Sequence, residues 1–141
     1  MKKTLSVLAG LLAVLLLCAC GTQPLPDWAD ADTLREKSIA LLDLYHTGQF
    51  NELTDAFHED VRAALSNDVW ADSYAQYVEP GGTFLGYADE MQTLGQKADD
   101  GMYATAVITA EYEKCSIVYT ISFAEGYAPV GLRIAGISEK K

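Results

Sequence analysis

Few side chains in this sequence have the chemistry of a catalytic group, and its two histidines come first. His58 is followed by Glu59 and Asp60, and a histidine beside carboxylates can transfer protons or bind a metal. Neither His46 nor His58 has the His-x-x-x-His or Glu-x-x-His spacing that places two ligands on one helix face. We therefore expect both histidines on the surface, with His46 in the last turn of a helix, where the dipole favours a cation. We expect no metal and no cofactor.

Aromatic residues give the sequence a second chemical feature. Five of them recur at helical or strand spacing on sides that we assign to the interior: Tyr45, Phe57, Trp70, Tyr74 and Tyr119. The small residues Ala104, Ala106 and Ala110 stand opposite, where larger side chains would have filled the space. We expect these aromatics to bound a pocket for a small amphipathic ligand. In the alternative, the aromatics fill the core and the alanines let a helix approach closely.

The N-terminus has the pattern of a leader. Two lysines precede about fourteen apolar residues, which is short of the roughly 20 that a membrane-spanning helix needs. The run Leu17-Cys18-Ala19-Cys20-Gly21 resembles a bacterial lipoprotein box, which implies that Cys20 is lipidated and becomes the first mature residue. We therefore predict a signal peptide over residues 1–19, a lipidated cysteine and tether over 20–31, and a membrane partner through the Cys20 lipid. Cys115 is then the one ordinary thiol, which excludes an internal disulfide framework.

The charge balance restricts the partners. Twenty acidic and ten basic residues give a formal charge of −10, which becomes −12 when Lys2 and Lys3 leave with the leader. Nucleic-acid affinity requires Lys and Arg to neutralise phosphates, so we expect no nucleic-acid partner. A basic surface for anionic lipid is excluded on the same ground.

The first half of the mature chain has helical periodicity. Thr33 to Glu36 reads as a capping box that opens a helix, and Gly48 is a plausible end. A short helix over 50–57 follows. Ser66 is an expected N-cap for a third helix, in which one face carries Trp70, Tyr74 and Tyr77.

After Gly82 the apolar period changes from 3.6 to 2. Two runs alternate cleanly, over 102–112 and 115–123; a last run covers 130–134, and a weaker first strand over 83–94 contains Gly86, which suggests a bulge. The short connections at 98–101 and 124–126 require antiparallel pairing. We therefore predict an α+β domain over residues 32–141, with three N-terminal helices packed on a curved four-stranded antiparallel sheet.

This order resembles an uncharacterised bacterial family, the domain of unknown function 3887. The resemblance rests on Thr47-Gly48-Gln49-Phe50, on Phe57 to Ser66, on Ala110 to Lys114 and on Ile117 to Phe123, and it extends over residues 33–137. It implies a cone similar to nuclear transport factor 2, with helices against a curved sheet. Members of the family are often lipoproteins or extracytoplasmic. The family brings no established catalytic residues.

Taken together, these features predict a lipid-anchored protein on the extracytoplasmic face of the cell membrane. Its expected role is non-catalytic binding of a small ligand or an envelope partner. One alternative is an enzyme of the ketosteroid-isomerase or polyketide-cyclase type, with Asp89 or Glu90 as the cavity base and Tyr119 as the oxyanion donor. Another is a homodimeric interaction module that pairs through the outer sheet face, which carries Tyr103, Thr105, Val107, Thr109, Val118 and Thr120.

Overall fold

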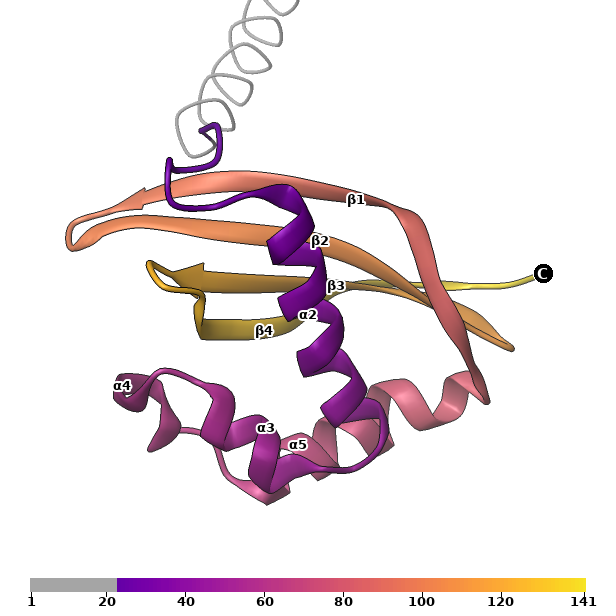
Figure 1. Ribbon diagram of the computed structural model, residues 1–141. Coiled ribbons are helices and arrows are strands. Elements are labelled where there is room, and N and C mark those ends of the chain that lie inside the picture. Colours follow the sequence, from indigo (N-terminus) through magenta and orange to yellow (C-terminus); the bar gives the residue numbers. More distant parts are fainter. Residues whose placement is uncertain (1–22) are drawn as a thin grey trace, which may run out of the picture.

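A computed structural model of the chain describes residues 23–141. The expected signal peptide and Cys20 lie outside the described residues. Within the described residues, helices are followed by a four-stranded antiparallel sheet, so the predicted α+β class is confirmed (Figure 1). No helix in this range is long and apolar enough to cross a membrane.

The first described helix, α2 (Ala31–His46), begins earlier than the capping box predicted. Asp30 is the N-cap, and its carboxylate accepts a hydrogen bond from the Thr33 backbone N–H at 2.8 Å. Thr33 therefore lies inside the first turn and does not open the helix. The predicted end is correct, because Thr47 is the C-cap and Gly48 takes a positive φ of 73°.

After this first helix the sequence predicted two more helices, whereas the structure has five shorter helical segments between α2 and the sheet. They are α3 (Phe50–Ala56), α4 (Glu59–Arg62), α5 (Asn67–Ser73), the π-helical turn η1 (Tyr74–Val78) and the 3₁₀ turn η2 (Glu79–Gly81). Ser66 caps α5 as expected, accepting from Val69 N–H at 3.3 Å. The wider η1 turn brings Val78 into the core, while Tyr77 stays 43% exposed.

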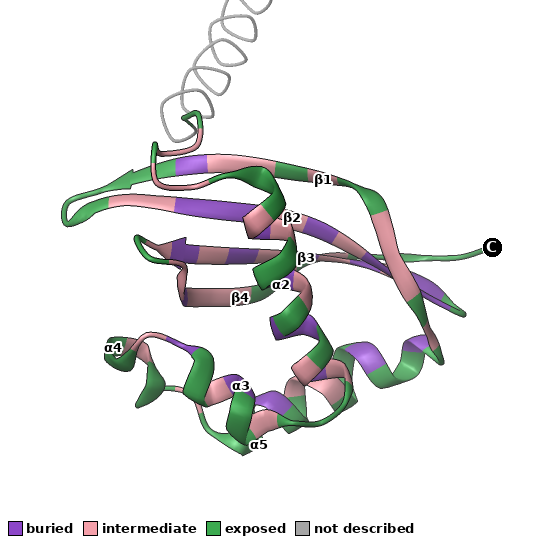
Figure 2. Cartoon of the chain, in the orientation of Figure 1, coloured by how far each residue is buried: buried purple, intermediate pink, exposed green. Residues whose placement is uncertain are grey.

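The strands are β1 (Phe84–Ala98), β2 (Gly101–Tyr112), β3 (Cys115–Ala124) and β4 (Ala128–Glu139), hydrogen-bonded in that order. The predicted alternation is confirmed in β2 and β3, whose inner side chains are buried (Figure 2). Thr105 is an exception, because it was expected on the open outer face. It is buried there beside Gln96 and Ser122, with its hydroxyl 3.0 Å from that of Ser122.

Strand β1 is bent, as the glycine at position 86 suggested. Tyr87 pairs with Ala110 and Met91 pairs with Ile108. Between these two pairs β1 therefore contains two more residues than β2, and the extra residues form a bulge where the strand bends (Figure 1). Arg35 of α2 holds the bulge, donating to the carbonyl oxygens of Ala88 and Asp89 at 2.9 and 3.3 Å. The bend carries the first residues of β1 toward the C-terminal end of α2.

The helices cover the inner face of the sheet unevenly. Helix α2 packs on β1 and β2, where Ala104, Ala106 and Ala110 are fully buried. Beyond the buried Pro129, the inner residues of edge strand β4 are only half-buried or exposed: Leu132, Ile134 and Ile137 (Figure 2). The sheet therefore has a closed half under α2 and an open half along β4.

Part of the expected tether is docked on the domain. Gln23 and Gly95 exchange two backbone hydrogen bonds, at 3.0 and 2.7 Å. The Trp28 ring packs edge-on against Tyr127, at 5.4 Å between centroids. Residues 23–30 therefore lie against the sheet, beside β1 (Figure 1).

Candidate functional site

A pocket of about 300 Å³ lies on the open half of the sheet, and we name it the β4 pocket. Its volume is far above the roughly 30 Å³ that one water occupies in the liquid, and it reaches the lower end of the usual range for ligand sites. Tyr77 and Ile137, each more than two-fifths exposed, lie on its rim. The residues that line it are Tyr45, Trp70, Ser73, Tyr77, Tyr119, Leu132, Arg133, Ile134 and Ile137.

The structure brings three of the five expected pocket residues together. Tyr45, Trp70 and Tyr119 line the β4 pocket. Phe57 and Tyr74 do not: Phe57 is buried behind Trp70, with ring centroids 5.6 Å apart, and Tyr74 packs edge-on against Tyr45 at 5.4 Å. The small alanines of β2 lie under α2 instead, as the alternative reading of these alanines predicted. That these residues hold a ligand stays a prediction.

The aromatic walls are fixed by hydrogen bonds and edge-on ring contacts. The hydroxyl groups of Tyr45 and Ser73 are 2.8 Å apart, and burial raises the pKa of Tyr45. Trp70 donates its indole N–H to the Thr54 hydroxyl at 2.9 Å. Tyr45 and Tyr119 meet edge-on at 6.2 Å. The pocket therefore has rigid apolar walls with hydroxyl groups among them.

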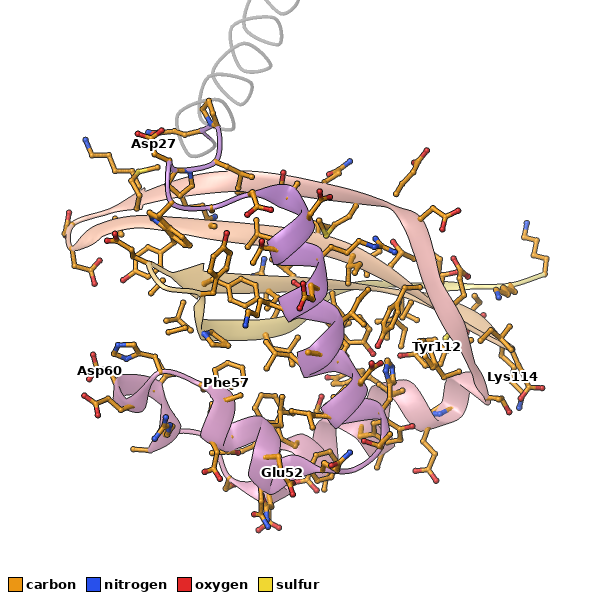
Figure 3. The ribbon with its side chains drawn as sticks, viewed as in Figure 1. Asp27, Glu52, Phe57, Asp60, Tyr112 and Lys114 are labelled. Carbon is orange, nitrogen blue, oxygen red and sulfur yellow. The ribbon has the colours of Figure 1, made fainter. Side chains whose placement is uncertain are left out.

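Behind this wall a chain of polar side chains runs through the interior to the surface. The Tyr119 hydroxyl is 2.7 Å from that of Tyr112, which is 2.5 Å from His46 Nε2. His46 Nδ1 is 3.2 Å from the Tyr87 hydroxyl, which donates to Asp43 at 2.8 Å. Figure 3 places Tyr112 beside the bent end of β1. We name this series the Asp43–Tyr119 chain; it joins the exposed Asp43 carboxylate to the buried hydroxyl of Tyr119.

His46 is not the surface cation that the sequence suggested. It does lie in the last turn of α2, but its ring stacks on Phe84 at 4.2 Å and is half-buried. Burial lowers the pKa of His46 from 6.5 to about 4, outweighing the opposing effect of the Asp43 charge. The imidazole is therefore neutral near pH 7. Burial likewise raises the pKa of Tyr87, Tyr112 and Tyr119 far above the usual value.

Bending of β1 is what completes this chain. A regular β1, without the bulge after Tyr87, would pair with β2 in a different register. Tyr87 would then lie opposite another residue of β2. Sequence reasoning missed Tyr87 and Tyr112 as members of a polar network. A signal did exist for Tyr112, which lies on the apolar side of the alternating run over 102–112. None existed for Tyr87, because Gly86 left the facing of the first strand undecided. No pattern in the sequence predicts how many residues the bulge contains.

The other residues considered for chemistry lie apart from this site. His58 caps α4, where its Nδ1 accepts from Asp60 N–H at 3.2 Å and lies 3.5 Å from the Asp60 carboxylate. Asp89 and Glu90 are both exposed, in a depression on the outer face with Met91, Val107, Thr109 and Val118. The isomerase alternative required one of these acids inside the cavity, and the structure places neither there.

A larger depression, about 1060 Å³, lies where the docked segment meets the two hairpin turns. Its acidic members are Asp27, Asp60, Asp100 and Glu125, and all four are exposed. It has no buried polar group on which a ligand would be oriented, so the β4 pocket is the better candidate site.

Comparison with known proteins agrees with the fold. The structure resembles the NMR structure of a protein from Ruminococcus gnavus ATCC 29149, with a TM-score of 0.71 and 22% sequence identity. The match covers 79% of this chain and 96% of the other. No curated protein matches the chain significantly. Residues 38–132 match the family described as Protein of unknown function (DUF3887). The chain therefore belongs to the DUF3887 family.

Proposed function

We propose that this protein is a membrane-anchored extracytoplasmic lipoprotein that binds a small, uncharged amphipathic molecule in the β4 pocket. The single observation that carries the binding role is the pocket itself, with Tyr45, Trp70 and Tyr119 on its wall. Small-molecule sites are concave and mostly apolar, with a few fixed polar groups that orient the ligand. The hydroxyl groups of Tyr45 and Ser73 supply such groups here.

The expected ligand is uncharged because the pocket offers it no buried charge. Arg133 pairs with Thr120, so alternation along the strand puts its side chain on the outer face. Ile134, the next residue, pairs with Tyr119 and faces the pocket. Placing an unpaired ionic group against this wall would cost desolvation free energy with no partner to compensate.

The anchoring part of the proposal rests on the lipoprotein-like run at Cys20 and on the acidic composition. The fold is proposed to be a nuclear transport factor 2-like cone, which the bent β1 and the coverage of one sheet face support. A cone of this kind commonly has a cavity between helices and sheet, and sharing a fold is not by itself evidence for an activity. A catalytic role of the isomerase type lacks its base, because Asp89 and Glu90 are exposed.

Tryptophan fluorescence tests the binding role. The chain has two tryptophans, so Trp28→Phe leaves Trp70 as the reporter on the pocket wall. We expect cyclohexanol, added to the full chain in phosphatidylcholine vesicles, to change Trp70 emission saturably. Leu132→Phe should abolish this response by filling the pocket, whereas Val107→Phe, on the outer face, should keep it. A response that is linear, or unaltered by Leu132→Phe, would contradict the proposal.

A further inference from the structure

The docked segment (residues 23–30) is fastened to the domain at two places. Gln23 and Gly95 exchange two backbone hydrogen bonds on edge strand β1, at 3.0 and 2.7 Å. Further along, the Asp30 backbone N–H donates to the hydroxyl of Tyr127, in the turn between β3 and β4, at 3.0 Å. Two prolines between these places restrict the backbone. The chain therefore enters the domain at a fixed position beside Gly95.

Very little chain separates this position from the expected lipid. Only Gly21 and Thr22 lie between Cys20 and Gln23 in the sequence. A connection of this length reaches about 10 Å at full extension. A lipid on Cys20 would therefore hold Gln23 within about 10 Å of the headgroup layer, with Gly95 one strand spacing of about 4.8 Å beyond it.

The β4 pocket lies across the sheet from this position. The strand order is β1-β2-β3-β4, and neighbouring strands lie about 4.8 Å apart, so β4 is about 14 Å from β1. Figure 1 shows the docked segment at the top of the domain, along β1. Helix α5, which carries Trp70 and Ser73 of the pocket, lies at the bottom.

We propose that the docked segment orients the anchored domain, with the hairpin end of β1 (residues 95–98) next to the phospholipid headgroups and the β4 pocket open to the aqueous phase. The orientation requires the lipid on Cys20, so it rests on the proposed function. It adds the source of the ligand, which enters the pocket from the water and does not move sideways out of the bilayer.

The charge of the anchored end is consistent with an orientation set by the short connection. Asp27, Asp99, Asp100 and Glu125 are all exposed in the docked segment and the two hairpin turns. Anionic headgroups repel such residues, so this end has no surface that adheres to an anionic membrane. The domain is therefore held beside the bilayer by its connection and is not laid flat on it.

Paramagnetic relaxation in NMR measures the orientation. The lipidated chain is placed in phosphatidylcholine nanodiscs that contain a lipid with a gadolinium-binding headgroup, and lutetium discs give the baseline. Relaxation of an amide proton by gadolinium falls steeply with distance. Since the pocket lies at least about 14 Å beyond β1, we expect the enhancement at Lys97 on β1 to be about tenfold or more that at Tyr77 on the pocket rim.

Two changes to the connection should reduce this ratio. In Gly95→Ala, a Cβ would lie 2.3 Å from the Pro24 carbonyl oxygen, which breaks the bridge to Gln23. A twelve-residue Gly/Ser insert after Thr22 leaves the domain untouched and adds about 20 Å of reach, so the domain turns freely and the ratio should fall to about twofold or less. Gly136→Ala is the matched control and should keep the wild-type ratio, because its Cβ meets no atom within 4 Å.

Each outcome decides one claim. Equal enhancement at Lys97 and Tyr77 in the anchored wild type, or a larger one at Tyr77, overturns the orientation and leaves anchoring and binding standing. A ratio that survives the Gly/Ser insert also overturns it, because the short connection then does not set the orientation. Cys20→Ser should show no enhancement at either amide. If the wild type likewise shows none and does not purify with the discs, the anchoring part of the proposed function falls, and the orientation falls with it.

Discussion

His46 Nε2 lies 2.5 Å from the Tyr112 hydroxyl, inside the fold. This contact joins the last turn of α2 to the end of β2, and through Tyr87 to the bent part of β1. A neutral histidine is therefore built into the junction of three elements. The stability of this junction therefore depends on the protonation state of His46.

Stability should fall as the pH is lowered from about 6.5 to about 4. In this window the unfolded chain binds a proton on His46 that the folded chain excludes, because the folded pKa is about 4 and the ordinary value is 6.5. Partial exposure of the ring reduces the effect to about 2 kcal/mol. Urea unfolding across this range should show the loss. The His46 part should level off below about pH 4, whereas stability should go on falling there because hydrogen bonds lower the pKa of Asp30, Glu111 and Glu113 in the folded chain.

The matched variant for this pH dependence is His46→Asn, which keeps a polar side chain but cannot titrate. It should be less stable than the wild type near pH 7 and should lack the histidine part of the slope. Val107→Ala, on the outer face away from His46, should retain the wild-type slope. Equal slopes in the wild type and His46→Asn would contradict the burial of a neutral imidazole.

Thr54→Val should destabilise the fold by about 1–2 kcal/mol. Valine keeps the shape of threonine but leaves the buried Trp70 indole N–H without its acceptor. Thr109→Val on the outer face should have little effect, because Thr109 is only half-buried there. Thermal unfolding followed by circular dichroism compares the two variants. A Thr54→Val protein as stable as Thr109→Val would show that this bond does not hold the pocket wall.

Gly95→Ala should detach the docked segment. A Cβ at position 95 would lie 2.3 Å from the Pro24 carbonyl oxygen, so the bridge between Gln23 and Gly95 cannot persist. Loss of its two hydrogen bonds should cost about 1–3 kcal/mol locally and speed amide exchange at both positions. The control is Gly136→Ala, where a Cβ meets no atom within 4 Å. Unchanged exchange at Gln23 in Gly95→Ala would contradict the docking.

Cys20→Ser should abolish lipid attachment, and Cys18→Ser should not. The prediction follows from the small Ala19 before Cys20 and the bulky Leu17 before Cys18. Metabolic labelling of bacteria with an alkyne-bearing fatty acid, followed by membrane fractionation, measures both variants. Labelling that persists in Cys20→Ser would contradict anchoring through this residue.

Much of the fold could be predicted because local physics determines it. Alternation in β2 and β3 assigned the inner face correctly, and Gly48 and Ser66 marked helix ends through their backbone and capping chemistry. The predicted helix start at Thr33 was wrong because a stronger cap, Asp30, lies three residues before it. Asp30 bonds the backbone N–H of Thr33, which the Glu36 side chain would have bonded in a capping box opened by Thr33.

The site was harder to predict because it depends on long-range packing. Tyr45, Trp70 and Tyr119 could be assigned to one interior from periodicity alone. The pocket lies along β4 and away from the alanines of β2, since α2 covers the closed half of the sheet. The burial of His46 follows from the bulge in β1, whose length no local pattern specifies.

A two-dimensional NMR spectrum that correlates the ring nitrogens of the histidines with their ring protons, recorded near pH 7, tests the central claim most directly. With His58→Gln used to assign the two rings, the account predicts that His46 is neutral, with its proton on Nδ1 and none on Nε2. This is the tautomer that makes every donor in the Asp43–Tyr119 chain point toward Asp43. A proton on Nε2, or a charged imidazolium, would contradict the account.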